Sequence, residues 1–191
     1  MGPQHWGYRG MTATIARLMD QVADRAAVVR PAEICIGAHW TLVWLDLQGT
    51  LMAGLASTLS GADGAHHYGG GPPMPEAGHL LQLSARDLVA MATSERILEA
   101  SVGLATINAL LDVDETLCVE VNAADVIADR AQGRHVAIVG HFPFVPKLRR
   151  VADRVSVLEL NPRDGDLPAE RAPDILPEAD IAALTGTSLL N

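Results

Sequence analysis

The chain has 191 residues, of which 49% are hydrophobic and 19% charged, a balance that supports a buried core and excludes intrinsic disorder. Its formal net charge of -9 disfavours contact with a phosphate backbone, so we exclude nucleic acid as a partner. No run approaches the roughly 20 apolar residues of a membrane helix, and the first ten residues lack the apolar region of a signal peptide. We therefore expect no membrane partner and a cytoplasmic location.

The first half of the chain is typical of an α+β domain. Apolar residues at helical spacing predict an amphipathic helix over residues 8–27. The run "EICIGAHWTLVWLDLQGTLMAGLAST" predicts strands with "QGT" as the turn between two of them. A loop rich in Gly and Pro follows over residues 60–79 and contains His66 and His67, which we interpret as solvated loop residues. Ser84 and Asp87 predict a capping box, and a further helix is expected over residues 95–111.

The pattern changes in the second half to alternating short helices and continuous apolar strands. Helices are predicted at "AADVIADRA" and "PKLRRVADR", and strands at "HVAIVG", "VSVLEL" and "ADIAALTG". This order favours a parallel sheet built from right-handed βαβ units, which is an α/β fold. We place the domains at residues 1–118 and 119–191. Cys35 and Cys118 lie in strand-like apolar runs without a Cys or His nearby, so we expect both to be buried.

Ligands of open parallel sheets bind at the carboxyl ends of the strands, and this rule selects three stretches. They are "GHFPF", "ELNP" and "TGTSLLN", and we expect His141, Glu159 and Thr185 to lie at one edge of the sheet. The predicted ligand-binding residues are Gly140, His141, Phe142, Pro143, Phe144, Lys147, Glu159, Asn161, Thr185, Gly186, Thr187 and Asn108.

Several of these residues have more than one interpretation. His141, next to the flexible Gly140, is a candidate general base, metal ligand or hydrogen-bond donor, or else a turn histidine that bonds local backbone. Lys147 follows Pro146 in the first turn of a helix, where it would attract an anionic ligand or remain solvated. Asn108 is polar within the apolar run "GLATINALL", so it either satisfies a backbone group or faces a ligand.

NAD is not favoured as a cofactor. Glu159 follows Gly140 by 19 positions, close to the roughly 20-residue offset of a ribose-binding acid in dinucleotide folds. The Gly-rich loop of those folds is missing, however, and Phe142 and Phe144 would occupy the space of a pyrophosphate. The absent loop counts equally against a methyltransferase. Neither cysteine has a metal-ligand spacing to a histidine, so a bound metal would arrive as a chelate.

The stretches "VGHFPF", "LELNPRDGDLP", "ILPEADIAALTGTSLLN" and "EASVGLATINALL" resemble a known family, the putative heavy-metal chelation domain family, long catalogued as a domain of unknown function. The resemblance implies an N-terminal domain like that of enolase, a Rossmann-like second domain, and a site in the cleft between them. Members of the family continue beyond "TGTSLLN", whereas this chain stops at Asn191, so the second domain is expected to be incomplete. Leu189 and Leu190 would then be exposed, and we expect a homo-oligomer that covers them.

The function predicted from these observations is binding, with or without transformation, of a small anionic or metal-chelating molecule, either a metal ion or a metal complex. Two alternatives remain open. One is an enzyme that uses His141 as acid/base and Glu159 to orient a hydroxylated substrate. The other is a structural or assembly protein with a vestigial site.

Overall fold

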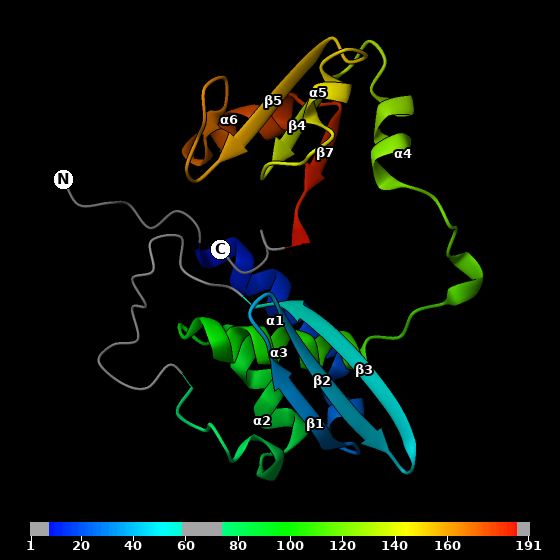
Figure 1. Cartoon of the computed structure of the whole chain (residues 1–191), viewed down its shortest axis with the longest axis vertical. Helices are drawn as coiled ribbons and strands as arrows, with labels where there is room; N and C mark the ends of the chain where they lie inside the picture. Colours follow the sequence, from blue (N-terminus) through cyan, green and yellow to red (C-terminus); the bar gives the residue numbers. More distant parts are fainter. Residues whose placement is uncertain (1–7, 59–73, 187–191) are drawn as a thin grey trace, which may run out of the picture. The chain divides into compact units, whose positions relative to one another are not determined.

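The structure is a computed structural model, and it describes residues 8–58 and 74–186. These residues form two compact units that divide after Val113 (Figure 1). The first, unit 1, contains a three-stranded antiparallel sheet with helices, and the second, unit 2, contains a four-stranded parallel sheet with helices. The predicted fold, an α+β domain followed by an α/β domain, is confirmed.

The described residues of unit 1 form three strands, three α-helices and two short 3-10 helices. Its elements are α1 (Tyr8–Ala26), β1 (Arg30–Ile36), β2 (Trp40–Leu47), β3 (Thr50–Ser57), η1 (Leu80–Gln82), α2 (Ala85–Ala90), η2 (Met91–Thr93) and α3 (Ile97–Leu110). The predicted turn at "QGT" joins β2 to β3, with positive φ at Gln48 and Gly49. The predicted capping box is present at the start of α2, where the Ser84 side chain accepts from Asp87 N and the Asp87 side chain accepts from Ser84 N.

The core of unit 1 lies between the sheet and α3. Ten of the 14 residues of α3 are buried, as expected for a helix that is apolar on all sides. The helix approaches β3 closely at Gly54, where a Cβ atom would lie only 2.0 Å from the carbonyl oxygen of Ala105. In β2, Thr41, Val43 and Leu45 alternate inward and are buried against the helices.

The outer face of this sheet remains apolar. Cross-strand neighbours on this face include Leu42 with Leu55 and Trp44 with Ala53, and Trp40 lies at its end with 59% of its surface exposed. Cys35 pairs with Leu42 and is exposed, because Ile34 and Ile36 occupy the inward positions of β1. Our prediction that Cys35 is buried was therefore wrong: the apolar run is an edge strand with one open face.

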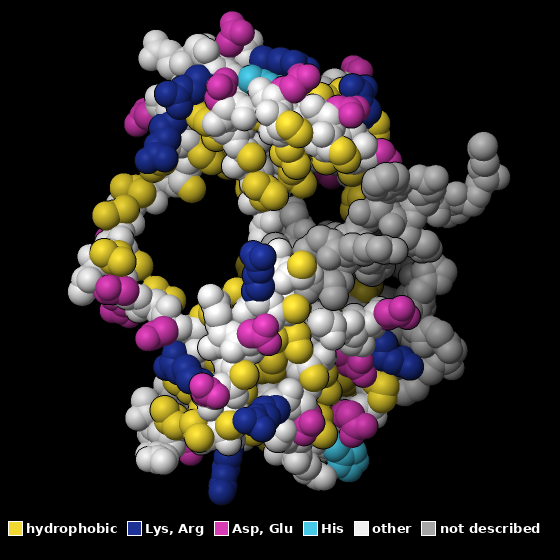
Figure 2. Space-filling model, turned by 180° about the vertical axis from the view of Figure 1, so that it is seen from behind, with side chains coloured by type: hydrophobic (Ala, Val, Ile, Leu, Met, Phe, Trp, Pro, Cys, Tyr) yellow, Lys and Arg dark blue, Asp and Glu magenta, His cyan; other side chains and the backbone are white. Residues whose placement is uncertain are grey.

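The segment that joins the units is extended and exposed. Val113, Leu117, Val119 and Val121 each expose 60% or more of their surface, and apolar side chains follow this connection in Figure 2. Cys118 lies in the same segment and is also exposed, so the prediction of a second buried thiol was wrong. In the part of the chain that the structure describes, no strand pairs with residues 118–121, and all four of these residues are exposed.

Unit 2 is a three-layer arrangement around its parallel sheet. Its elements are η3 (Glu115–Leu117), α4 (Ala123–Arg130), β4 (His135–Val139), α5 (Val145–Leu148), β5 (Arg154–Glu159), β6 (Leu167–Pro168), η4 (Ala169–Arg171), α6 (Ala172–Ile175), η5 (Leu176–Glu178) and β7 (Ile181–Leu184). The strand order is β6-β5-β4-β7, and every pairing is parallel.

Two separate apolar clusters cover the two faces of this sheet. On one face, Val136, Ile138 and Val157 pack with residues of α4 and α5. On the other face, Ala137 and Leu158 pack with Ile175 of α6. The alternation along β4 and β5 therefore decides which helix each strand residue meets.

The helix predicted at "PKLRRVADR" is much shorter than expected. α5 spans only Val145–Leu148, and the chain continues through turns closed by bonds such as Val151 N to Leu148 O. The backbone N–H groups of Asp153 and Arg154 then donate to the carbonyl of Arg134. The chain must enter β5 beside the start of β4, and this requirement ends the helix after one turn.

Candidate functional site

The ends of the central strands meet at one edge of the unit 2 sheet, as predicted. β4, β5 and β7 are parallel neighbours, so His141, Glu159 and Thr185 all lie at their carboxyl ends. The N–H of Gly140 donates to the carbonyl of Leu158 at 2.9 Å, and that of Thr185 donates to Val139 at 3.2 Å. These bonds hold the three strand ends in register.

Gly140 is needed at the end of β4 for two reasons. Its φ of +93° lies in the left-handed region that side chains disfavour, and a Cβ atom there would lie 2.5 Å from Cγ2 of Thr185. The absence of a side chain thus lets the chain turn sharply after the strand. As a result, His141 projects from the end of the sheet rather than continuing along it.

His141 contacts a buried carboxylate. Its Nδ1 lies 3.5 Å from Oδ2 of Asp166, which is an ion-pair contact and longer than a hydrogen bond. The Asp166 side chain is only 1% exposed, whereas that of His141 is 32% exposed. A carboxylate accepts and does not donate, so a hydrogen bond formed by closing this contact would place the hydrogen on Nδ1 and leave Nε2 as the lone-pair nitrogen of the neutral ring.

Asp166 is fixed by the turn that precedes β6. Its Oδ2 accepts from Arg163 N at 3.1 Å, and its own N–H donates to the carbonyl of Arg163 at 2.9 Å. Sequence reasoning did not single out this residue. The available signal was an Asp directly before the apolar pair Leu167–Pro168, but that pair is too short to be read as a strand.

The two phenylalanines of the "GHFPF" loop are mainly packing residues. The rings of Phe142 and Phe144 stack with centroids 4.8 Å apart, and both rings pack against the cluster under α4 and α5. Pro143 between them is exposed. The packing of these two partly buried rings therefore attaches the loop that carries His141 to the core of unit 2.

Lys147 has a partner on the neighbouring helix. Its Nζ lies 2.5 Å from Oδ1 of Asp125 in α4, and both side chains are about half exposed. Glu159, the last residue of β5, is half-buried, and by alternation it shares the face of Val157 and α5. Asn161 and Gly186 are exposed, and Thr187, His66 and His67 lie outside the described residues.

Asn108 belongs to unit 1. Its side-chain amide lies in α3 and donates to the carbonyl of Leu55 in β3 at 2.9 Å. Of the two interpretations offered by the sequence, this bond corresponds to the satisfaction of a backbone group. The residue is exposed in spite of this bond.

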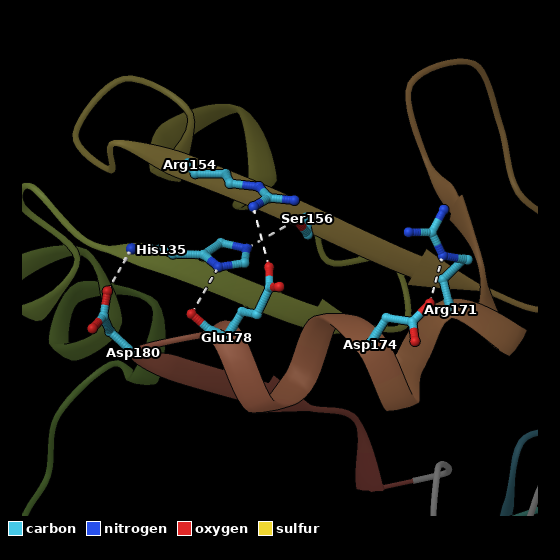
Figure 3. A network of polar contacts seen from close by, with 7 residues as sticks. All are labelled: His135, Arg154, Ser156, Arg171, Asp174, Glu178 and Asp180. Carbon is cyan, nitrogen blue, oxygen red and sulfur yellow. Dashed lines mark hydrogen bonds and ion pairs between the residues drawn. The ribbon is translucent and has the colours of Figure 1, made fainter.

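A second polar cluster lies at the opposite, amino end of β4 (Figure 3). The ring of His135 has partners on both nitrogens: the carbonyl of Glu178 at 3.2 Å from Nδ1, and Oγ of Ser156 at 3.0 Å from Nε2. The His135 N–H also donates to Asp180, and Arg154 forms an ion pair with Glu178 at 3.6 Å. Because Ser156 is buried in mid-strand, we interpret this cluster as structural: its hydrogen bonds hold β4 against β5 and against the start of β7.

Among residues 8–58 and 74–186, no group of three or more His, Cys, Asp or Glu side chains is arranged to hold a metal ion. An open hollow of about 610 Å³ lies in unit 1, lined by Gln21, Val22, Arg25, Leu110, Leu111 and Asp112. None of the predicted ligand-binding residues lines it. The helices within the described ranges are too short or too polar to cross a bilayer.

Two family profiles match the chain. One matches residues 16–111, half of the 191-residue chain, and the other matches residues 122–191; both carry the description "Putative heavy-metal chelation". The chain belongs to the putative heavy-metal chelation family. The resemblance carried by the sequence motifs is thus confirmed. A comparison of this family member with the curated proteins found no match.

Two crystal structures share the fold of this heavy-metal chelation family member. One is a protein with unknown function from the DUF364 family of Desulfitobacterium hafniense, with 23% identity and a TM-score of 0.72 over 96% of this chain and 71% of that one. The other is a DUF364 family protein of unknown function from Pyrococcus horikoshii, with 22% identity and a TM-score of 0.73 over 92% and 70%. At this level of identity, the likeness establishes the architecture.

Proposed function

We propose that this protein binds a small metal-chelating or anionic ligand beyond the carboxyl ends of β4 and β7, with Nε2 of His141 as the anchoring atom. The contact between His141 and the buried Asp166 carries the proposal. A histidine that ligates a metal usually donates its other ring N–H to a carboxylate or carbonyl, which fixes the tautomer and the ring orientation. Asp166 is in the position to do this for His141.

The metal would arrive with other ligands already attached. Within the described residues, His141 and Asp166 have no third metal-binding side chain beside them, and one imidazole cannot retain a divalent ion alone against water. A metal complex with an open coordination position needs only one protein donor. This favours a bound chelate and agrees with the family description.

The test uses copper(II) iminodiacetate, a small complex that accepts an imidazole in its open positions. In nitrogen–proton NMR spectra, paramagnetic broadening should appear at the amides of Gly140 and Phe142 in the wild type. His141→Ala should abolish it. The matched control is His79→Ala, since His79 is an exposed histidine whose side chain caps no helix. Equal broadening of Gly140 and Phe142 in His141→Ala would contradict the proposal.

The same contact supports a second candidate, in which His141 is the acid/base of an enzyme. A base oriented by a carboxylate on its other nitrogen is a recurrent arrangement for proton transfer, and Nε2 would exchange a proton with a substrate hydroxyl. Under this alternative, a mixture of small hydroxylated acids incubated with the protein should show turnover by mass spectrometry. The turnover should disappear in His141→Ala and persist in His79→Ala.

A further inference from the structure

A second cationic side chain lies at the turn that holds Asp166. Arg149 follows α5, and its Nη2 and Nη1 atoms lie 3.8 and 4.0 Å from the position that a Cβ atom would take at Gly165. Gly165 directly precedes Asp166 in the turn from Arg163 to Asp166. The guanidinium of Arg149 and the imidazole of His141 therefore lie beside the same four-residue turn.

The Arg149 side chain has no carboxylate partner among the described residues. Neither Asp164 nor Asp166 lies within ion-pair distance of its guanidinium, and Oδ2 of Asp166 is already shared by Arg163 N and His141. Three other cations of unit 2 have a carboxylate partner: Lys147 pairs with Asp125, Arg154 with Glu178, and Arg171 with Asp174. In a chain with a net charge of -9, an exposed arginine without such a partner beside the proposed site is available to a ligand.

We propose that Arg149 binds a carboxylate or phosphate group of the ligand that His141 anchors, so that the ligand is an anion; the inference rests on the function proposed above. Arginine suits this role better than the neighbouring Lys147. Its planar fork donates two parallel hydrogen bonds to a carboxylate or phosphate, and it is more weakly hydrated than an ammonium group. Lys147, the cation that the sequence favoured, is held by Asp125 on α4.

The experiment titrates inorganic phosphate, and separately citrate, into the full chain and follows the amide signals of Gly165 and Asp166 by NMR. These signals should shift in the wild type, and Arg149→Ala should raise the dissociation constant about tenfold, the effect of losing a charge-assisted pair of hydrogen bonds. Arg149→Lys should give an intermediate value. Arg150→Ala is the matched control, because Arg150 is the adjacent exposed arginine and also has no ion-pair partner among the described residues.

Two results would overturn the inference: equal affinity of Arg149→Ala and the wild type, or an equal loss in Arg150→Ala. The absence of localised shifts with either anion in the wild type would do so as well. The copper(II) iminodiacetate measurement separates this inference from the proposed function, because that complex is neutral. Arg149→Ala should bind it like the wild type, whereas His141→Ala should not.

Discussion

At the scale of single residues, the role proposed for His141 depends on Asp166. In that proposal the buried carboxylate beside Nδ1 favours the tautomer in which Nε2 accepts a proton or a metal. Asp166→Asn keeps the shape and an oxygen that can still accept from Arg163 N, but it removes the negative charge. We expect the affinity for copper(II) iminodiacetate to fall by about 10–100-fold, the usual cost of losing a carboxylate that orients a ligating histidine.

Calorimetric titration of Asp166→Asn and the wild type checks this expectation. Asp164→Asn is the matched control, because Asp164 lies in the same turn but is exposed and contacts no histidine. If both variants retained the wild-type affinity, the buried carboxylate would have only a structural role.

Gly140 permits a second prediction at this scale. Gly140→Ala should destabilise unit 2, because alanine is disfavoured at φ +93° and its Cβ would meet Thr185. Left-handed backbone costs a non-glycine residue on the order of 1–3 kcal/mol. Gly133→Ala, with φ +67° and no atom within 4 Å of the Cβ position, carries the backbone cost alone. In urea unfolding, Gly140→Ala should therefore have a lower free energy of unfolding than Gly133→Ala. The reverse order would show that the Thr185 side chain moves away from the added Cβ atom at little cost.

The positions of individual site residues could be predicted from the sequence where a general rule of the fold applies. The rule that parallel strands present ligands at their carboxyl ends located His141 and Thr185. Asp166 was not found because its importance depends on β6, a strand of two residues that leaves no hydrophobic pattern. The error at Cys35 has a similar origin, since burial depends on which face of an edge strand is covered, and an apolar run does not contain that information.

At the scale of elements, the sequence predicted local structure correctly where a few neighbouring residues are enough to form it. The capping box of α2 is an example, since Ser84 and Asp87 bond reciprocally. Ser84→Ala should lower the stability of unit 1 by about 0.5–2 kcal/mol, as the loss of an N-cap side chain does. Ser57→Ala, which removes a hydroxyl away from any helix end, is the control in thermal unfolding; an equal loss in both would refute the capping argument.

The same box predicts a dependence on pH. The hydroxyl and the backbone N–H of Ser84 donate to the carboxylate and hold the pKa of Asp87 below its ordinary value of 3.8. A folded pKa below the unfolded one contributes stability that is complete above the unfolded pKa and is lost as the pH falls through the folded pKa. The stability advantage of the wild type over Asp87→Asn should therefore be constant near neutral pH and shrink below about pH 3.8. An advantage that grows on acidification, in urea unfolding at several pH values, would contradict this.

The short α5 marks the limit of element prediction. Its apolar and basic residues continue a helical pattern to Arg154, yet the helix ends at Leu148. The end is set by a tertiary requirement, the bonds of Asp153 and Arg154 to Arg134 beside β4, which override local propensity.

At the scale of the whole molecule, each unit has its own core. Among residues 8–58 and 74–186, the apolar cluster of unit 1 contains no residue of unit 2, and the two clusters around the parallel sheet contain none of unit 1. Gly54→Ala would place a Cβ atom 2.0 Å from the backbone of α3, and overpacking of this kind costs typically 1–3 kcal/mol. We expect faster hydrogen exchange across unit 1 and unchanged protection of β4 and β5, measured by mass spectrometry against Ala53→Ser as control. Faster exchange in β4 and β5 would contradict independent cores.

The predictions of a homo-oligomer and of weak NAD binding stay predictions. Leu189 and Leu190, on which the first depends, lie outside the described residues. Light scattering at micromolar concentration measures the assembly state.

Calorimetric titration with NAD tests the prediction of weak NAD binding, and a low-micromolar affinity would restore the dinucleotide interpretation.

The tryptophans on the sheet of unit 1 have an optical consequence. Trp40 and Trp44 lie in β2, the remaining tryptophan is Trp6, and both tyrosines also precede residue 70, so the aromatic residues of unit 2 are Phe142 and Phe144 alone. The indole emission of Trp40 and Trp44 therefore reports on the antiparallel sheet of unit 1, and unit 2 contains no indole of its own. In a Trp6→Phe variant, a fluorescence melt follows the sheet that carries Trp40 and Trp44, while circular dichroism in the far ultraviolet records the helices and strands of both units.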